Sequence, residues 1–575
     1  MMLAKLGRLC LPPLLLATAL TPREVEACGG FFCDAGPTVM PVDQTGETII
    51  FWIDETGPDP FTEAHIQIQY EGEAEQFAWI IPVLAVPEVL VGSQPLFDNM
   101  LQATVPQFVT QTTFSGDCSG GFGLGCSKED DSLSAADSFA GDGDGDGDGD
   151  GDGPNILDRG FAGAFEYVTL TGDSVDEVVT WLEMAGYAQD DEAPPILEQY
   201  LQEGFVFVAV KLRSGVGVDE IHPLVIRYAG IEPCIPIRLT RIAAVEDMAI
   251  RAMFLGDARV APTNWPHVTI NHSRLDYVNG AAASYPEIVS LAIDEAGGRA
   301  FVTEYAGTDA VVATSGIYDP MWDAAAFTEI PVTSVVDELA AQGLLLCEGS
   351  GCVFSHPQVE VLLESYLPPP DGIYKHDFWS CLSCYEAQID LDVWDPLAFA
   401  AAFEQRIAGP GEHAIDMLSD AEYLTRLYTV LSPHEMTEDP LFHQTDGLGT
   451  VDNALSSTQN VDCNDGPTVF ALPDGRRVAL TSSGQMPDLG LPAAERIEQV
   501  PMMGPPQIIA DNGPDIDAAI EAHNDTRMVG PAPSCAVRGL GRDLGRRGGL
   551  EGVLTILAVF GIAWTHRGRR RREVA

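Results

Sequence analysis

The sequence predicts an α+β protein that is cross-linked by disulfides. We expect an N-terminal antiparallel β meander, a mixed α/β middle and a more helical C-terminal part. Three observations support this prediction: strand-like alternation near the N-terminus, helix-capping patterns in the middle, and cysteines in closely spaced pairs. The chain has 575 residues, 46% of them hydrophobic, which is enough for three or four domains of ~150 residues each.

The first 27 residues are typical of a secretory signal peptide. Basic Lys5 and Arg8 precede an apolar stretch at 9–20, and a small-residue cleavage pattern ends at Ala27. Cleavage there would make Cys28 the first residue of the mature chain. Lipid attachment to Cys28 is the alternative, although charged residues separate this cysteine from the apolar stretch.

Residues 28–114 form the predicted β-rich part, with strand-like patterns between 48 and 91. Apolar and polar side chains alternate at 65–70, as expected for a strand with one buried face. The apolar stretch that follows contains Pro82 and Pro87, which favours an edge or bulged strand.

Residues 115–155 form a low-complexity insertion that we expect to be disordered. Its strict Gly–Asp repeat offers no apolar side chain to bury, and its like charges repel each other. A solvated spacer is the favoured interpretation, and weak calcium binding is the alternative because carboxylates suit this ion. The candidate calcium ligands are Asp142, Asp144, Asp146, Asp148, Asp150 and Asp152.

Residues 156–320 should mix helices and strands in an α+β arrangement. Ser174 and Glu177 form a capping box, and Gly204 and Gly297 mark the ends of later helices. Helices are predicted at 175–187, 194–204 and 285–298, and strands at 205–213, 221–228, 235–244 and 300–305.

Residues 321–480 should be rich in helices and end in a hairpin. The turn of this hairpin is predicted at 473–475, and residues 481–549 are rich in Pro and Gly, which predicts a linker. Helical patterns occur at 332–345, 356–367, 395–407 and 419–432.

The C-terminal end combines Cys535, a basic spacer, a short apolar segment at 550–566 and a basic tail at 567–575. The apolar segment predicts a short transmembrane or sorting segment, and the arginines after it predict a cytoplasmic tail. This layout resembles the C-terminal sorting tails of myxobacterial surface proteins. The resemblance implies processing near Cys535 and a lipid-anchored product, and retention of the tail as an anchor is the alternative.

Ten cysteines remain when Cys10 leaves with the signal peptide and Cys535 is assigned to the tail. Because an exported protein meets an oxidising compartment, we expect five disulfides. Local pairing leaves Cys234 and Cys463 for a long-range bridge. The four close pairs are Cys28/Cys33, Cys118/Cys126, Cys347/Cys352 and Cys381/Cys384.

Zinc is the alternative for the last two pairs, because four thiols in two clusters could form a ribbon-like site. A redox role for Cys381 and Cys384 is a further alternative. The exported setting favours disulfides for both pairs. The residues of the two clusters are Cys347, Cys352 and His356, and His376, Cys381 and Cys384.

Five segments of the sequence together carry a family resemblance. They are 27–33, 64–83, 200–213, 285–307 and 424–442. These segments resemble an exported bacterial family that is known as domain of unknown function 2330. The resemblance covers roughly residues 27–480, and it implies export and a location in the cell envelope. It brings no activity, substrate or catalytic residue with it.

The sequence predicts no catalytic residue, no cofactor and no firm metal ligand. His434 and Glu435 lack the second histidine of a zincin, because Glu438 stands where that histidine is needed. His267 and His272 should face opposite ways on a strand, so with Asp276 they form no metal site.

The formal net charge of −56 excludes nucleic acid as a partner, since phosphate binding needs a basic surface. We therefore expect an exported protein of the envelope or cell surface, held to the membrane by its C-terminal tail. A structural or binding module with a surface protein or glycan as partner is the favoured interpretation. The alternative is an envelope hydrolase with an unrecognised site.

Overall fold

The computed structural model describes residues 44–68, 78–116, 154–185, 192–213, 216–348, 351–464 and 466–528. Within these ranges, no helix is both long and apolar enough to cross a membrane. Several predictions lie outside the described residues. They concern the signal peptide at 1–27, Cys28 and Cys33, Cys118 and Cys126, the six aspartates of the Gly–Asp repeat, Cys535, and the C-terminal segments at 550–566 and 567–575.

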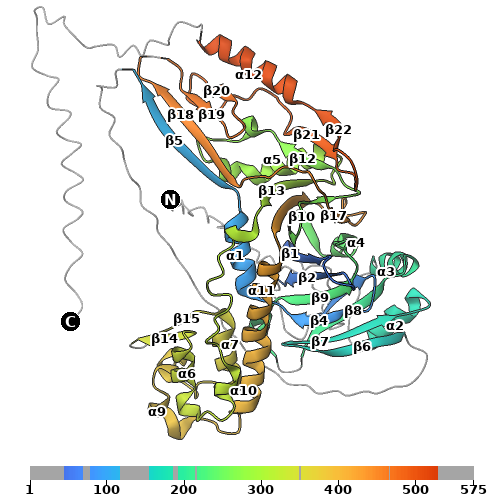
Figure 1. The fold of residues 1–575 in the computed structure, drawn as a ribbon, viewed down its shortest axis with the longest axis vertical. Coiled ribbons are helices and arrows are strands. Elements are labelled where there is room, and N and C mark those ends of the chain that lie inside the picture. The colour runs from blue at the N-terminus through green and yellow to red at the C-terminus, as the bar shows by residue number, and fades with distance from the viewer. Residues whose placement is uncertain are drawn as a thin grey trace, which may run out of the picture. The chain divides into compact units, whose positions relative to one another are not determined.

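The described residues form a mixed fold of helices and strands, which confirms the predicted α+β class. Its largest element is a mixed sheet with the strand order β22-β21-β12-β13-β16-β10-β1-β2-β9-β4 (Figure 1). The strands of this main sheet are β1 (Gln44–Asp54), β2 (Phe61–Gln67), β4 (Glu88–Val91), β9 (Leu224–Ala229), β10 (Ala244–Gly256), β12 (His267–Ile270), β13 (Phe301–Gly307), β16 (Tyr423–Leu431), β21 (Ala494–Gln499) and β22 (Gln507–Asp511).

The centre of the main sheet is buried on both faces. On one face, Ile49 and Phe51 of β1 join a large apolar core, while Ile50 and Trp52 on the other face join a second core. Helices α1 (Gln94–Thr104) and α11 (Gly409–Asp420) contribute to the second core. Strand side chains alternate between faces, so β1 and the paired β2 each present one set of residues to each core.

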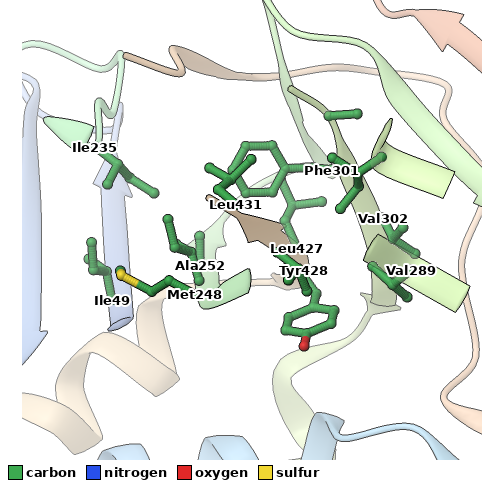
Figure 2. Packing of buried hydrophobic residues seen from close by; sticks show 14 of the residues in the cluster. Ile49, Ile235, Met248, Ala252, Val289, Phe301, Val302, Leu427, Tyr428 and Leu431 are labelled. Carbon is green, nitrogen blue, oxygen red and sulfur yellow. The ribbon is translucent and has the colours of Figure 1, made fainter. Parts of the chain in front are cut away.

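Helix α5 (Ala281–Glu295) packs against β12, β16 and β21 of the main sheet. Figure 2 shows part of the large core there, where Val289 of α5 lies next to Val302 of β13. Leu427 of β16 and Phe301 of β13 belong to the same core. This packing explains why the apolar positions of α5 recur at helical spacing.

A second sheet has the order β3-β8-β7-β6 and is covered by two helices that share an apolar core with it. The N-cap of its first helix is Ser174, whose hydroxyl accepts a hydrogen bond from the Glu177 N–H, as the capping pattern predicts. The elements are β3 (Ala78–Val83), β6 (Asn155–Ala162), β7 (Phe165–Thr171), β8 (Val206–Leu212), α2 (Val175–Met184) and α3 (Ala193–Gln202).

The N-terminal strands begin as the predicted antiparallel pair, β1 with β2, but they do not continue as a meander. β3 pairs only with β8 in the second sheet, and β4 returns to the edge of the main sheet beside β9. Pro82 lies in β3, which is an edge strand, as proline favours. Pairing partners far along the chain therefore replace the local hairpins that the sequence suggests.

A third sheet has the order β20-β19-β18-β5, and two further strand pairs are β11 with β17 and β14 with β15. β19 and β20 pair on either side of the turn at 473–475, where the sequence predicts a hairpin. Their bounds are β5 (Gln107–Ser115), β11 (Val260–Pro262), β14 (Leu345–Glu348), β15 (Gly351–Phe354), β17 (Phe442–Gln444), β18 (Ala454–Asp462), β19 (Val469–Ala471) and β20 (Arg477–Ala479).

Five helices around 335–403 share a further apolar core with β14, and two disulfides lie in this helical part. Cys347 and Cys352 are opposite each other in the β14–β15 pair and are joined, and so are Cys381 and Cys384. Because these four cysteines are joined in disulfides, they have no free thiolate with which to bind zinc in the alternative site. The helices are α6 (Val335–Ala341), α7 (Pro357–Tyr366), α8 (Lys375–Ser380), α9 (Leu382–Tyr385) and α10 (Pro396–Phe403).

The predicted bridge between Cys234 and Cys463 is wrong. Cys234 is a free thiol, whereas Cys463 is already disulfide-bonded. The backbone of Cys234 bridges to Leu441, while Cys463 follows β18 and donates its N–H to the Ser115 carbonyl at the end of β5. The two cysteines are therefore held by different neighbours.

Three secondary-structure predictions are also wrong. Residues 419–432, predicted as helix, contain β16, because a strand buried on both faces lacks the alternation that marks a half-buried strand. Residues 235–244, predicted as strand, contain the short helix α4 (Ile237–Thr240). The predicted linker at 481–549 contains β21, β22 and α12 (Gly513–Met528), and Asn524 of α12 accepts a hydrogen bond from the Ala479 N–H of β20.

Candidate metal centre

Two potential metal ligands, Glu63 and His65, lie two residues apart on β2. Successive strand residues point to opposite faces, so residues i and i+2 share a face. Their cross-strand partners on β1 are Trp52 and Ile50, which belong to the core beneath α1 and α11. Both side chains therefore point away from the large core and toward the two helices. The side chains of Glu63 and His65 are 0% and 2% exposed.

The third potential ligand, His413, comes from α11. A π-helical turn, Glu404–Ala408, separates α10 from α11, and such turns change the register of a helix and often occur at functional sites. Gly411 lets α11 approach the chain at Ile317, because a Cβ atom at this position would overlap the Ile317 carbonyl oxygen. The His413 ring then lies beside Trp52, with 5.8 Å between ring centroids.

The Glu63 carboxylate joins the two histidines. Its Oε2 atom lies 3.0 Å from His65 Nε2 and 2.8 Å from His413 Nε2. The two imidazole rings are stacked with centroids 6.0 Å apart. Among the described residues, this is the group of three histidine, cysteine or carboxylate side chains whose ligand atoms converge, all within 4.8 Å of one another.

The protonation states of Glu63 and His65 suit metal ligands. Burial alone would raise the pKa of Glu63, but hydrogen bonds from His413 and His65 outweigh it, so the pKa is lowered and the carboxylate is ionised. Burial lowers the pKa of His65, against the opposing effect of Glu63. His65 Nδ1 is buried and makes no hydrogen bond with the described residues, which also favours the neutral imidazole.

Arg227 of β9 holds the other side of the Glu63 carboxylate. Its Nε atom donates to Glu63 Oε1 at 2.5 Å, and its Nη2 atom forms an ion pair with the same oxygen. Arg227 also pairs with Glu88 of β4 at 3.3 Å. Two carboxylates thus face one guanidinium, which leaves a local negative charge that a cation would neutralise.

The donor set fits a divalent transition metal better than calcium. Calcium takes six to eight oxygen ligands, whereas Zn²⁺ accepts imidazole nitrogens and a carboxylate oxygen at ~2.0–2.2 Å. A tetrahedral ion with such bonds would hold its ligand atoms roughly 3.3 Å apart. The two separations at Glu63 Oε2 lie within about 0.5 Å of this value, whereas the two histidine nitrogens are bounded only by the 4.8 Å that spans the group, so both histidines would have to shift to surround an ion.

The histidines near β12 and near the two disulfides have other partners. His267 Nε2 lies 2.8 Å from Thr303 Oγ1, and His272 Nδ1 lies 3.3 Å from the Tyr277 hydroxyl. They lie on β12 and just after it and do not converge with Asp276, whose carboxylate accepts from residues 278 and 279. The two histidines of the alternative zinc site also have other partners. The His356 side chain caps α7, and His376 Nδ1 accepts a hydrogen bond from the Cys352 N–H.

The cluster at Glu63, His65 and His413 was not predicted from the sequence. A Glu-x-His pattern in a strand places both side chains on one face, and this signal was available. His413 is 350 residues away from Glu63, and nothing local to α11 indicates its partner. Only the packing of α11 against the main sheet brings the three side chains together.

Comparison with known proteins gives one match. Residues 22–314 match the model of the DUF2330 family, which is described as an uncharacterized protein conserved in bacteria. No curated protein and no solved structure matches the chain. The matched range includes Glu63 and His65, whereas His413 lies beyond it. The matched range is also shorter than residues 27–480, over which the sequence resembles this family. Because the match covers just over half of the residues, the chain belongs to the DUF2330 family.

Proposed function

We propose that this protein is an exported, envelope-anchored binding module that holds a divalent transition metal, Zn²⁺, at Glu63, His65 and His413. The observation that carries the metal proposal is the convergence of two imidazoles on one buried, ionised carboxylate. The proposal of export and anchoring is supported by the signal-peptide pattern at 1–27 and the tail at 550–575.

The metal would join two elements that are far apart in the sequence. Glu63 and His65 belong to β2, and His413 belongs to α11, so one ion would link the main sheet to the helix that covers it. A ligand that binds only the folded state stabilises that state by mass action. The metal would therefore act as a structural clip between β2 and α11.

A metal-dependent envelope hydrolase is the second candidate. Three protein ligands leave a fourth position open, which is typical of catalytic zinc sites. The side chain of His413 is 27% exposed, so this ligand faces solvent on one side. Arg227 holds the opposite side of Glu63, and its second partner, Glu88, is held in that ion pair and is not free to act as a general base.

The test of the metal proposal is Zn²⁺ binding by the full mature chain, measured by competition with a chromophoric chelator. We expect one Zn²⁺ per chain in the wild type and at least a tenfold loss of affinity in His413→Ala. His434→Ala is the matched control, because His434 is an exposed histidine outside the cluster. Equal affinity in the wild type and His413→Ala would refute the site.

Co²⁺ substitution separates loss of the site from loss of folding. The wild type should give visible d–d absorption of a nitrogen- and oxygen-bound ion, and His413→Ala should lose it while its circular dichroism is unchanged. Hydrolysis of model esters or peptides that depends on the loaded metal would favour the enzyme over the binding module. Protease accessibility on intact cells tests the location, and an intracellular, fully protected protein would contradict export.

A further inference from the structure

A second candidate site lies on the opposite face of β1 and β2. Ile49 and Phe51 of β1 and Ala64 and Ile66 of β2 form one wall of a cleft, and Trp79 to Leu84, in and after β3, form the other. The cleft therefore lies between the main sheet and the second sheet. Its lining is mostly apolar and includes a few polar side chains.

Glu47 is the buried polar group of this cleft. Its side chain lines the cleft, and its Oε2 atom is buried and makes no hydrogen bond with the described residues. Burial raises the pKa of Glu47 to about 7, so a large share of the carboxyl is protonated near neutral pH. A buried polar atom without a partner is costly unless a ligand or water satisfies it.

The other polar side chains that line the cleft are Tyr228, Glu232, Cys234 and Thr240. Burial raises the pKa of Tyr228 and, strongly, that of the Cys234 thiol, so both are neutral at physiological pH. A thiol with a raised pKa is a poor nucleophile. Tyr228 and Cys234 therefore suit binding of a neutral molecule, and Cys234 does not suit catalysis.

The size of the cleft limits what it can hold. It offers about 50 Å³ to the centres of water-sized molecules, several times the ~10–15 Å³ that one water needs. Leu84, which is 53% exposed, and the exposed Glu232 also line the cleft, so it opens to solvent there. This space fits the end of a ligand, either a short alkyl chain or one aromatic ring with a polar atom, and the rest of the ligand can extend through the opening at Leu84 and Glu232, whereas a folded peptide does not fit.

We propose that this cleft binds the apolar end of a small neutral molecule whose carbonyl or ether oxygen accepts a hydrogen bond from the Glu47 carboxyl. The apolar walls supply most of the binding free energy by removing hydrocarbon from water. The Glu47 O–H fixes the orientation and satisfies the unpaired carboxyl. This site is independent of the metal cluster, which lies on the other face of the same strands.

The test uses a fluorescent naphthalene ketone, 6-propionyl-2-(dimethylamino)naphthalene, as the probe for the full mature chain. We expect saturable binding with energy transfer from Trp79, and loss of that transfer component in Trp79→Phe. N-phenyl-1-naphthylamine, which lacks an acceptor oxygen, is the matched probe. It should bind without any contribution from Glu47.

Two variants of Glu47 separate hydrogen bonding from packing. Glu47→Gln keeps a donor and should bind the ketone as the wild type does. Glu47→Leu removes the donor and should weaken ketone binding about tenfold, the effect of one hydrogen bond of ~1.4 kcal/mol, while leaving N-phenyl-1-naphthylamine unchanged. Equal weakening for both probes, or none for the ketone, would overturn the role of Glu47.

A third variant tests the location of the site. Ala64→Leu adds side-chain volume to the wall of the cleft and should reduce binding of both probes. Ala310→Leu, at an exposed position, is its control. Undiminished binding in a folded Ala64→Leu variant, as judged by circular dichroism, would place the probe elsewhere and refute the cleft as the binding site.

Discussion

The buried carboxyl of Glu47 should make the stability of the protein depend on pH in a way that one substitution removes. In the folded chain its pKa is raised to about 7 from the ordinary value of 4.5, because burial disfavours the charged form. Below pH 4.5 the carboxyl is protonated in both folded and unfolded chains. Between pH 4.5 and 7 only the folded chain keeps the proton, so stability falls as the pH rises.

The size of this effect follows from the pKa shift. At about 1.4 kcal/mol per unit of pKa, a shift from 4.5 to about 7 corresponds to a loss of about 3 kcal/mol by pH 8. Glu47→Gln is neutral at every pH and has nearly the same shape. If the variant equals the protonated wild type in stability, it should be more stable than the wild type by about 1 kcal/mol at pH 5 and by about 3 kcal/mol at pH 8.

Chemical denaturation followed by tryptophan fluorescence, at pH values from 5 to 9, measures this difference directly. The comparison between the two proteins cancels the contributions of all other titrating groups, provided that they are common to both. If the two stability curves run parallel from pH 5 to 9, Glu47 does not titrate in a buried site. The reasoning about the cleft would then fail at its first step.

Three further outcomes follow from the packing. Gly411→Ala should weaken Zn²⁺ binding in the chelator competition, because the new Cβ overlaps the Ile317 carbonyl and displaces α11; unchanged affinity would contradict this. Arg426→Met should lower the free energy of unfolding by about 3–5 kcal/mol, since it leaves the buried Glu304 without its ion-pair partner, and adding Glu304→Leu should restore most of it. Ser174→Ala should cost about 1 kcal/mol in denaturation experiments, as expected for a lost helix N-cap, and a larger loss would indicate another role.

Local signals in the sequence predicted the elements that depend on neighbouring residues. Ser174 caps α2 as its pattern indicates, and the turn at 473–475 separates a pair of strands. Pro82 lies in an edge strand, as proline requires when it cannot donate a ladder hydrogen bond. In each case the deciding interaction lies within a few residues or follows from the chemistry of one residue.

Elements that depend on distant partners were not predictable in this way. β16 lies between β10 and β13, so its side chains are buried on both faces and lose the alternation that distinguishes strands from helices. The pairing of β1 with β10 joins residues about 200 positions apart, and it is parallel, which no hairpin pattern signals. The same limit applies to Cys234, whose spacing to Cys463 gave no information about its free thiol.

Two of the three residues of the candidate metal site could be paired from the sequence alone. Glu63 and His65 share a strand face because of their spacing, which is a local property. His413 joins them only because α11 follows a π-helical turn and approaches the chain closely at Gly411. Neither feature has a sequence pattern that indicates its partner, so only the structure shows that the three side chains converge.

X-ray absorption spectroscopy at the zinc edge, on the full mature chain loaded with one equivalent of Zn²⁺, reports directly which side chains bind the ion. Glu63, His65 and His413 predict a shell of nitrogen and oxygen atoms at ~2.0–2.1 Å, with the multiple-scattering pattern of two imidazoles. His413→Ala should lose one imidazole from this pattern. Sulfur at ~2.3 Å would place the zinc on cysteine thiolates instead, and a spectrum of hexaaqua zinc would show that the cluster binds no metal.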